Sequence, residues 1–134
     1  MTVVWLPFDL DPDRLPTGLR ADRWDGTGPW PGSVGEVALY VLPYMIGPQA
    51  LQPMPAMRSL QVMQTLTAGY DDVLGARPPG VLLCNAPGVH DASTAELAVT
   101  LALAALRGIP DFVRAAGEHR WAPQRRPALA DRRV

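Results

Sequence analysis

The sequence predicts one α/β domain built around a parallel β-sheet. Its central apolar runs, residues 37–42, 60–66 and 81–84, are continuously apolar rather than alternating, which is typical of strands that are covered on both faces. Segments rich in proline and glycine separate these runs, as expected of connections between strands. With 134 residues, of which 48% are apolar, the chain can form one domain with a hydrophobic core but not two ordinary ones.

Two further strands and two short helical segments complete this prediction. Residues 3–6 form a short apolar run, and residues 20–24 are polar enough for an edge strand. Residues 51–58 could form a short helix, although two prolines limit it. Residues 70–74 could form one helical turn.

The clearest helical signal lies in residues 94–107. Ser93 precedes this segment and Glu96 follows three residues later, a capping-box pattern in which each side chain bonds the other's free backbone N–H. Gly108 suits the left-handed position after a helix, and a second helix is expected over residues 111–119. The first helix has no charged residue between Glu96 and its last residue. Because a helix that is apolar all round is normally buried on all sides, we expect it to pack against a second domain, a second subunit or both.

Composition excludes several classes of protein. The formal net charge of −1 argues against nucleic acid or an anionic membrane as the main partner, and the absence of lysine excludes a Schiff-base or phosphate-loop lysine. The N-terminus lacks the pattern of a signal peptide, and the apolar stretch at residues 95–106 is too short to span a bilayer. The expected location is therefore cytoplasmic, with no nucleic acid and no membrane as partner.

Two loops carry candidate binding residues. The segment from Thr67 to Asp71 follows a predicted strand, and small residues at the carboxyl end of a parallel strand let backbone N–H groups approach an anion closely. This segment is either a cradle for a small carboxylate or an ordinary connection. His90 lies just before the capped helix, whose N-terminus favours anions. It either touches a bound acid or cofactor or is an ordinary solvated side chain.

Other groups give weaker signals. Tyr44 ends a predicted strand and either walls a pocket or fills a core. Cys84, the sole cysteine, lies in a predicted strand and is expected to pack rather than react. His90 and His119 have no metal-ligand spacing with any cysteine or acidic pair, so no metal site is predicted. The sequence contains neither G-x-G-x-x-G nor G-x-S-x-G, the motifs of dinucleotide binding and of a nucleophile turn.

Two stretches of the chain carry a resemblance to a known family. Residues 60–71 read LQVMQTLTAGYD and residues 88–98 read GVHDASTAELA. The first resembles the strand and substrate loop of the D-2-hydroxyacid dehydrogenases, and the second resembles the start of their inter-domain helix with its Ala-Glu pair. Residues 108–121 resemble the segment and wrapping helix that follow. The resemblance covers essentially the whole chain, most weakly its first 35 residues.

The resemblance implies a fold, a site and partners. It implies a flavodoxin-like domain with a five-stranded parallel sheet in the order 2-1-3-4-5, and an apolar helix that lies between domains and at a dimer interface. The substrate carboxylate would bind the backbone of Ala68 and Gly69, while Thr94 would lie near the cofactor. Tyr70 replaces a commoner aliphatic residue, which changes the expected pocket shape. The expected substrate-binding residues are Tyr44, Ala68, Gly69, Tyr70 and His90.

The resemblance also implies that most of the catalytic machinery lies elsewhere. In the family, the arginine that clamps the carboxylate, the glutamate and histidine of the proton relay and the dinucleotide fingerprint belong to a later Rossmann domain. We therefore expect residues 1–121 to form an incomplete substrate-binding domain and residues 122–134 to form a linker towards a missing Rossmann domain. No catalytic residue and no cofactor are expected in this chain alone.

These implications define an expected function and one alternative. The parent enzyme would be a homodimer that interconverts small 2-keto acids and D-2-hydroxy acids with NAD or NADP, and this fragment alone would be inactive. The alternative is a stand-alone module that binds a small acid or mediates dimerisation without catalysis.

Overall fold

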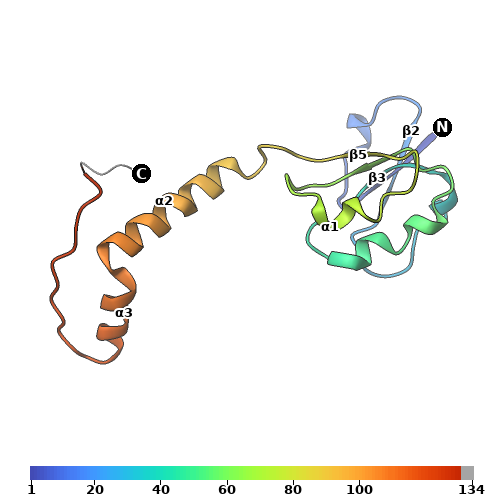
Figure 1. Cartoon of the computed structure of the whole chain (residues 1–134). Helices are drawn as coiled ribbons and strands as arrows, with labels where there is room; N and C mark the ends of the chain where they lie inside the picture. The colour runs from blue at the N-terminus through green and yellow to red at the C-terminus, as the bar shows by residue number, and fades with distance from the viewer. Residues whose placement is uncertain (131–134) are drawn as a thin grey trace. The chain divides into compact units, whose positions relative to one another are not determined.

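A computed structural model describes residues 1–130 (Figure 1). Contacts between residues divide the chain into two compact units, Met1–Val89 and a second unit that begins at His90. The first unit contains the strands β1 (Thr2–Leu6), β2 (Leu19–Arg23), β3 (Val37–Val41), β4 (Val62–Gln64) and β5 (Leu82–Cys84). Its helices are the short α1 (Asp71–Leu74) and the 3-10 helices η1 (Pro12–Arg14), η2 (Val34–Glu36), η3 (Gly47–Leu51) and η4 (Met54–Ala56).

The predicted sheet is confirmed. Its five strands lie in the order β2-β1-β3-β4-β5 and all neighbouring pairs are parallel. The run predicted over residues 60–66 is a shorter strand than expected, and the helical turn predicted over residues 70–74 is α1. Because the strands are parallel, β3, β4 and β5 all end at the same edge of the sheet.

One face of the sheet carries the main hydrophobic core. Trp5, Tyr40 and Met63 are opposite one another in adjacent strands and are fully buried. Trp24 adds a further aromatic ring, whose centroid lies 6.0 Å from that of Trp5. The Tyr40 hydroxyl donates to the carbonyl of Ala50 at 2.8 Å, and burial raises the pKa of Tyr40 above its ordinary value. These large side chains anchor the sheet, since full burial of one stabilises by about 1.5–3 kcal/mol.

The opposite face of the sheet is less fully covered. Val4, Leu6 and Val41 are buried there, in a cluster that contains no helical residue. Leu82 of β5 is 59% exposed. The prediction that residues 81–84 are covered on both faces is therefore wrong: β5 is an edge strand with one neighbour, and Cys84 within it is only half-buried.

The chain between β3 and β4 does not form the helix predicted over residues 51–58. It forms the two 3-10 helices η3 and η4 instead. Pro53 and Pro55 lack the N–H that an α-helix interior requires, so this segment can form only short turns with i→i+3 hydrogen bonds.

The second unit contains α2 (Asp91–Arg107) and α3 (Ile109–Gly117), coloured orange in Figure 1. α2 begins earlier than predicted, with His90 rather than Ser93 as its N-cap, so the predicted capping box between Ser93 and Glu96 is wrong. The Ser93 hydroxyl donates to the His90 carbonyl at 3.0 Å. A serine whose hydroxyl bonds back to the preceding turn fits inside a helix and does not have to begin it.

The break between α2 and α3 lies at the predicted glycine. Gly108 adopts the left-handed conformation, with φ at 65°, and its N–H bonds to carbonyls of the last turn of α2. α3 starts immediately afterwards, before the predicted residue 111, because Pro110 fits the first turn of a helix, where its missing N–H removes no bond. Within residues 1–130, no single helix is long and apolar enough to cross a membrane; α2 and α3 reach that length only together, and they are bent by 66°.

The segment after α3 is tied back to the helix junction. The Arg126 guanidinium forms an ion pair with Asp111 of α3 and donates to the side chain of Gln124. It also occupies the space beside Gly108, where a Cβ atom would lie 2.5 Å from Nε of Arg126. The linker role of residues 122–134 stays a prediction, and residues 131–134 of that segment lie outside the described residues.

Candidate functional site

The turn from Thr67 to Tyr70 connects β4 to α1 at the carboxyl edge of the sheet. Its carbonyl groups are held by hydrogen bonds from side chains. Oγ1 of Thr67 donates to the carbonyl of Gly69 at 2.7 Å, and Nδ2 of Asn85 donates to the carbonyl of Ala68 at 2.7 Å. The turn is therefore fixed from within and from the loop that follows β5.

The carbonyl of Thr67 itself accepts two hydrogen bonds. Thr65 is a buried residue that directly follows β4, and its Oγ1 donates to this carbonyl at 2.9 Å. The backbone N–H of Ala86 donates to the same carbonyl at 2.9 Å. Within residues 1–130, the backbone N–H groups of Ala68 and Gly69 donate to no protein acceptor. This pair of adjacent donors, on an exposed turn, is what a carboxylate needs for binding by the backbone.

Gly69 leaves room for an approaching ligand. A Cβ atom built on it meets no atom within 4 Å, and its φ does not lie in the left-handed region. A side chain at this position would therefore fit the turn of this chain without distortion.

A small cavity of about 80 Å³ lies at the ends of β3 and β4. Tyr44, Met45 and Thr67 contribute to its wall, so the structure brings the predicted Tyr44 close to the start of the turn. Met45 has a φ of 54°, a conformation that costs a non-glycine residue roughly 1–2 kcal/mol. Such a backbone persists only where the surrounding structure imposes it, and here Tyr44 and Met45 both line the cavity.

The other predicted residues lie elsewhere. Ala68 and Gly69 do not line this cavity, and Tyr70 lines a separate hollow of about 380 Å³ together with Asn85. His90 and Thr94 belong to the second unit, where the backbone N–H of Thr94 bonds to the His90 carbonyl at 2.9 Å. Within the first unit, the structure thus brings Tyr44 close to Thr67 at the start of the turn, but it does not bring the predicted residues together in one closed pocket.

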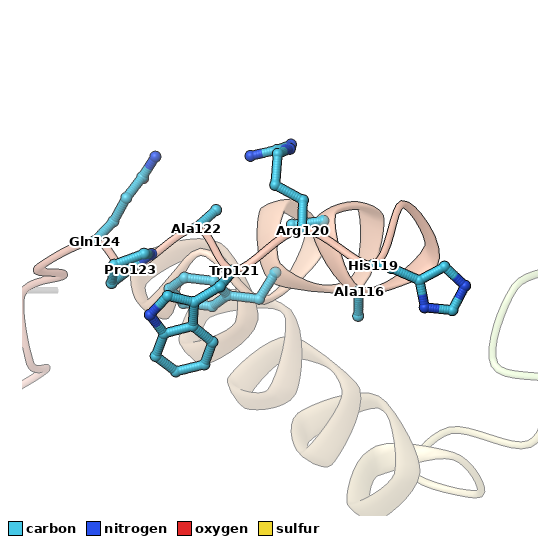
Figure 2. A pocket seen from close by; sticks show the side chains of 9 residues that line it. Ala116, His119, Arg120, Trp121, Ala122, Pro123 and Gln124 are labelled. Carbon is cyan, nitrogen blue, oxygen red and sulfur yellow. The ribbon is translucent and has the colours of Figure 1, made fainter.

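A larger hollow of about 630 Å³ lies in the second unit and contains none of the predicted binding residues (Figure 2). Figure 2 shows the Trp121 ring on one side of it, while the Arg120 side chain points away. Its lining is mainly apolar, with Phe112, Ala115 and Ala116 from α3. Its polar lining residues include His119, Arg120 and Gln124. Within residues 1–130, no group of three His, Cys, Asp or Glu side chains could hold a metal ion.

This chain is similar to known dehydrogenases in sequence over part of its length and in fold over most of it. The chain is 38% identical over 68 residues to D-3-phosphoglycerate dehydrogenase of Archaeoglobus fulgidus, a match that covers 49% of this chain and 13% of that protein. The solved structure of a D-isomer specific 2-hydroxyacid dehydrogenase from Xanthobacter autotrophicus, in complex with NADPH and MES, matches 94% of this chain with a TM-score of 0.61 and 23% identity. The resemblance to the D-2-hydroxyacid dehydrogenases is confirmed.

A second dehydrogenase structure gives the same fold. The NADPH-dependent glyoxylate/hydroxypyruvate reductase of Sinorhizobium meliloti, in complex with citrate, matches 98% of this chain with a TM-score of 0.62 and 22% identity. This chain covers 42% and 44% of the two solved dehydrogenase chains. It therefore spans less than half the length of either. No family model matches the chain.

The residues that hold this turn in place were not predicted from the sequence. Asn85 stands out in the sequence only as the first polar residue after β5, and its bond to Ala68 joins positions 17 residues apart. Thr65 and Thr67 each donate from the side-chain hydroxyl to the backbone carbonyl two residues later. That i, i+2 pattern of threonines was the one available signal in the sequence.

Proposed function

We propose that this chain is the substrate-binding part of an NAD(P)-dependent oxidoreductase that interconverts 2-keto acids and D-2-hydroxy acids. The observation that carries this proposal is the pair of backbone donors at Ala68 and Gly69, in a chain with the sequence and fold similarity just described. Two adjacent N–H groups match the two oxygens of a carboxylate. A 2-keto acid bound there by its carboxylate keeps its carbonyl carbon accessible to a reacting partner.

The remaining predicted residues complete the substrate side of the proposal. Tyr44 bounds the small cavity beside the turn, and Tyr70 bounds the hollow on Asn85's side. Walls of this size favour short acids over bulky ones. His90, at the N-cap of α2, is proposed to face the substrate, and Thr94, in the first turn of that helix, is proposed to lie near the cofactor.

The chain by itself does not fit a dinucleotide. Its sequence has no glycine-rich fingerprint, which in dinucleotide-binding domains lets the backbone approach the pyrophosphate. We therefore assign this chain the binding and orientation of the acid, and no step through the nicotinamide. The isolated chain is proposed to be inactive in hydride transfer, and the NAD(P) partner to be bound by a further domain.

Two other parts of the proposal concern the cellular location of the protein and its oligomeric state. We propose a cytoplasmic protein, because a nicotinamide-linked oxidation of small acids takes place where these metabolites and the cofactor pool are found. We also propose that the protein is a homodimer, because α2 has no buried residue while Leu97 and Leu101 are 58% and 60% exposed.

The proposal is tested by binding. The ¹⁵N-labelled 134-residue chain is titrated with sodium glyoxylate, and with sodium chloride at matched ionic strength as the control. Saturable shifts centred on the amide signals of Ala68 and Gly69, with glyoxylate only, are expected. A glyoxylate titration without any shift in this turn contradicts the proposed site.

Activity provides a second test. The chain mixed with NADH or NADPH and glyoxylate, pyruvate or hydroxypyruvate is expected to oxidise no cofactor above the rate in buffer. Measured turnover by the purified chain would contradict its assignment as the substrate-binding part alone.

A further inference from the structure

Asn85 lies at the end of β5, one strand away from the proposed carboxylate-binding turn. Its amide nitrogen reaches the carbonyl oxygen of Ala68 at 2.7 Å. It is thus the side chain through which the loop after β5 holds the turn after β4, on the same edge of the sheet.

The peptide bond converts this contact into an orientation of the proposed ligand group. The carbonyl of Ala68 and the N–H of Gly69 belong to one planar trans peptide unit and point in opposite directions. When Asn85 holds the carbonyl on the protein side, the Gly69 N–H must point to the other side. The same relation holds one residue earlier, where Thr65 and Ala86 hold the carbonyl of Thr67 and so orient the N–H of Ala68.

We propose that Asn85 is a positioning residue that keeps the Gly69 N–H directed at the substrate carboxylate. This inference rests on the proposed function, since it assigns a role within the same site. The side chain touches no reacting atom in this role; it acts through the peptide unit that it holds. An amide suits the position because it donates a hydrogen bond without adding charge, whereas a carboxylate could neither donate to the Ala68 carbonyl nor tolerate a nearby anion.

The experiment compares Asn85→Asp with a matched control. Asn85→Asp keeps the shape of the side chain and removes its donor. Ser59→Ala removes another hydrogen bond from a side chain to a backbone carbonyl, that from Ser59 to Gly35, which is outside the proposed site. Each ¹⁵N,¹³C-labelled variant is titrated with sodium glyoxylate, and its thermal unfolding is followed in parallel.

The expected result is specific to the turn. Asn85→Asp should raise the dissociation constant for glyoxylate about tenfold, shift the carbonyl ¹³C signal of Ala68 and the amide ¹⁵N signal of Gly69, and leave the rest of the spectrum in place. Ser59→Ala should bind like the unmodified chain. Equal affinity of Asn85→Asp and the unmodified chain overturns the positioning role and leaves the proposed function intact; failure of the unmodified chain to bind overturns both.

A measurement without mutation covers the case in which Asn85→Asp does not fold. The exchange of the Asn85 side-chain amide protons with solvent is measured in the unmodified chain with and without saturating glyoxylate. Binding should slow this exchange, because the anion and the amide polarise the same peptide unit from its two ends. An exchange rate that glyoxylate leaves unchanged overturns the proposal.

Discussion

Gly69 is the residue at which the proposed site can be probed with least disturbance of the fold. Its Cβ position is open and its backbone is not left-handed. We therefore expect Gly69→Val to fold normally and to weaken glyoxylate binding by about tenfold or more, because the side chain occupies the approach to the N–H pair. Isothermal titration or the amide titration measures the change.

Gly75→Ala is the matched control for this substitution. Gly75 also has an open Cβ position, and it caps the C-terminal end of α1 rather than the turn. Normal affinity for glyoxylate in Gly75→Ala and in Gly69→Val alike would show that the acid does not bind at this turn.

Asp22 supports a second prediction, which concerns how the free energy of unfolding changes at low pH. The hydrogen bond from Arg20 is the main cause that lowers the pKa of Asp22 below its ordinary value. Burial opposes this effect, and the hydrogen bond from Ser33 and the charge of Arg20 lower the pKa further. A carboxyl group whose pKa is lowered on folding stabilises the protein above its unfolded pKa, and that contribution is lost as the pH falls through the folded pKa.

The test is Asp22→Asn in urea unfolding, followed by the fluorescence of the buried Trp5 and Trp24. The variant should be less stable at pH 7 by about 0.5–1 kcal/mol. The difference should shrink as the pH falls below about 4, where the unmodified carboxyl becomes protonated. A difference that is the same at pH 7 and in strong acid would show that the carboxylate charge contributes nothing.

The position of the turn was predictable because its signal is local. The small residues Ala68 and Gly69 lie between β4 and α1, where the sequence places a turn, and their role in binding stays a prediction. The partners of that turn were not predictable, because the bond from Asn85 depends on how the ends of β4 and β5 align in the sheet. Spacing along the chain does not encode this alignment.

At the scale of elements, apolar runs between proline and glycine predicted the strands, because such runs have few other ways to be buried. Two of the errors among the helices depend on backbone hydrogen bonds. The helix over residues 51–58 fails where Pro53 has no N–H to donate, and α2 starts earlier than predicted, with His90 as its N-cap. Residue preferences at caps are weaker than the gain from one more bonded turn.

Gly108 is the element-scale test of the helix junction. Its left-handed conformation costs a residue with a Cβ about 1–2 kcal/mol, and the added atom would also displace Arg126 from its place beside Asp111. Gly108→Ala should therefore destabilise the second unit by at least that amount, measured by circular dichroism during thermal unfolding. Gly117→Ala, at the open end of α3, should leave the melting curve almost unchanged. Equal curves for both variants would contradict the constraint.

At the scale of the whole molecule, the exposed apolar surface of α2 is the feature from which we predict assembly. Its residues turn by about 100° each, so Leu101 and Leu103 lie on opposite sides of the helix. Neither is buried, with Leu101 60% exposed. Burial of one such side chain stabilises by roughly 1.5–3 kcal/mol, and several exposed together favour association strongly.

We therefore predict a dimer or larger assembly in solution, with residues 94–107 at the contact. Replacement of Leu101 and Leu103 together by Glu should produce a monomer in sedimentation velocity at micromolar concentration. Circular dichroism should retain the helical signal, because neither side chain is buried among residues 1–130. Phe8→Glu, which removes an exposed apolar side chain from the first unit, should still associate. A folded monomer of the unmodified chain that binds no hydrophobic dye would show that α2 needs no partner. That result would contradict the inference that a helix without a polar face must form an interface.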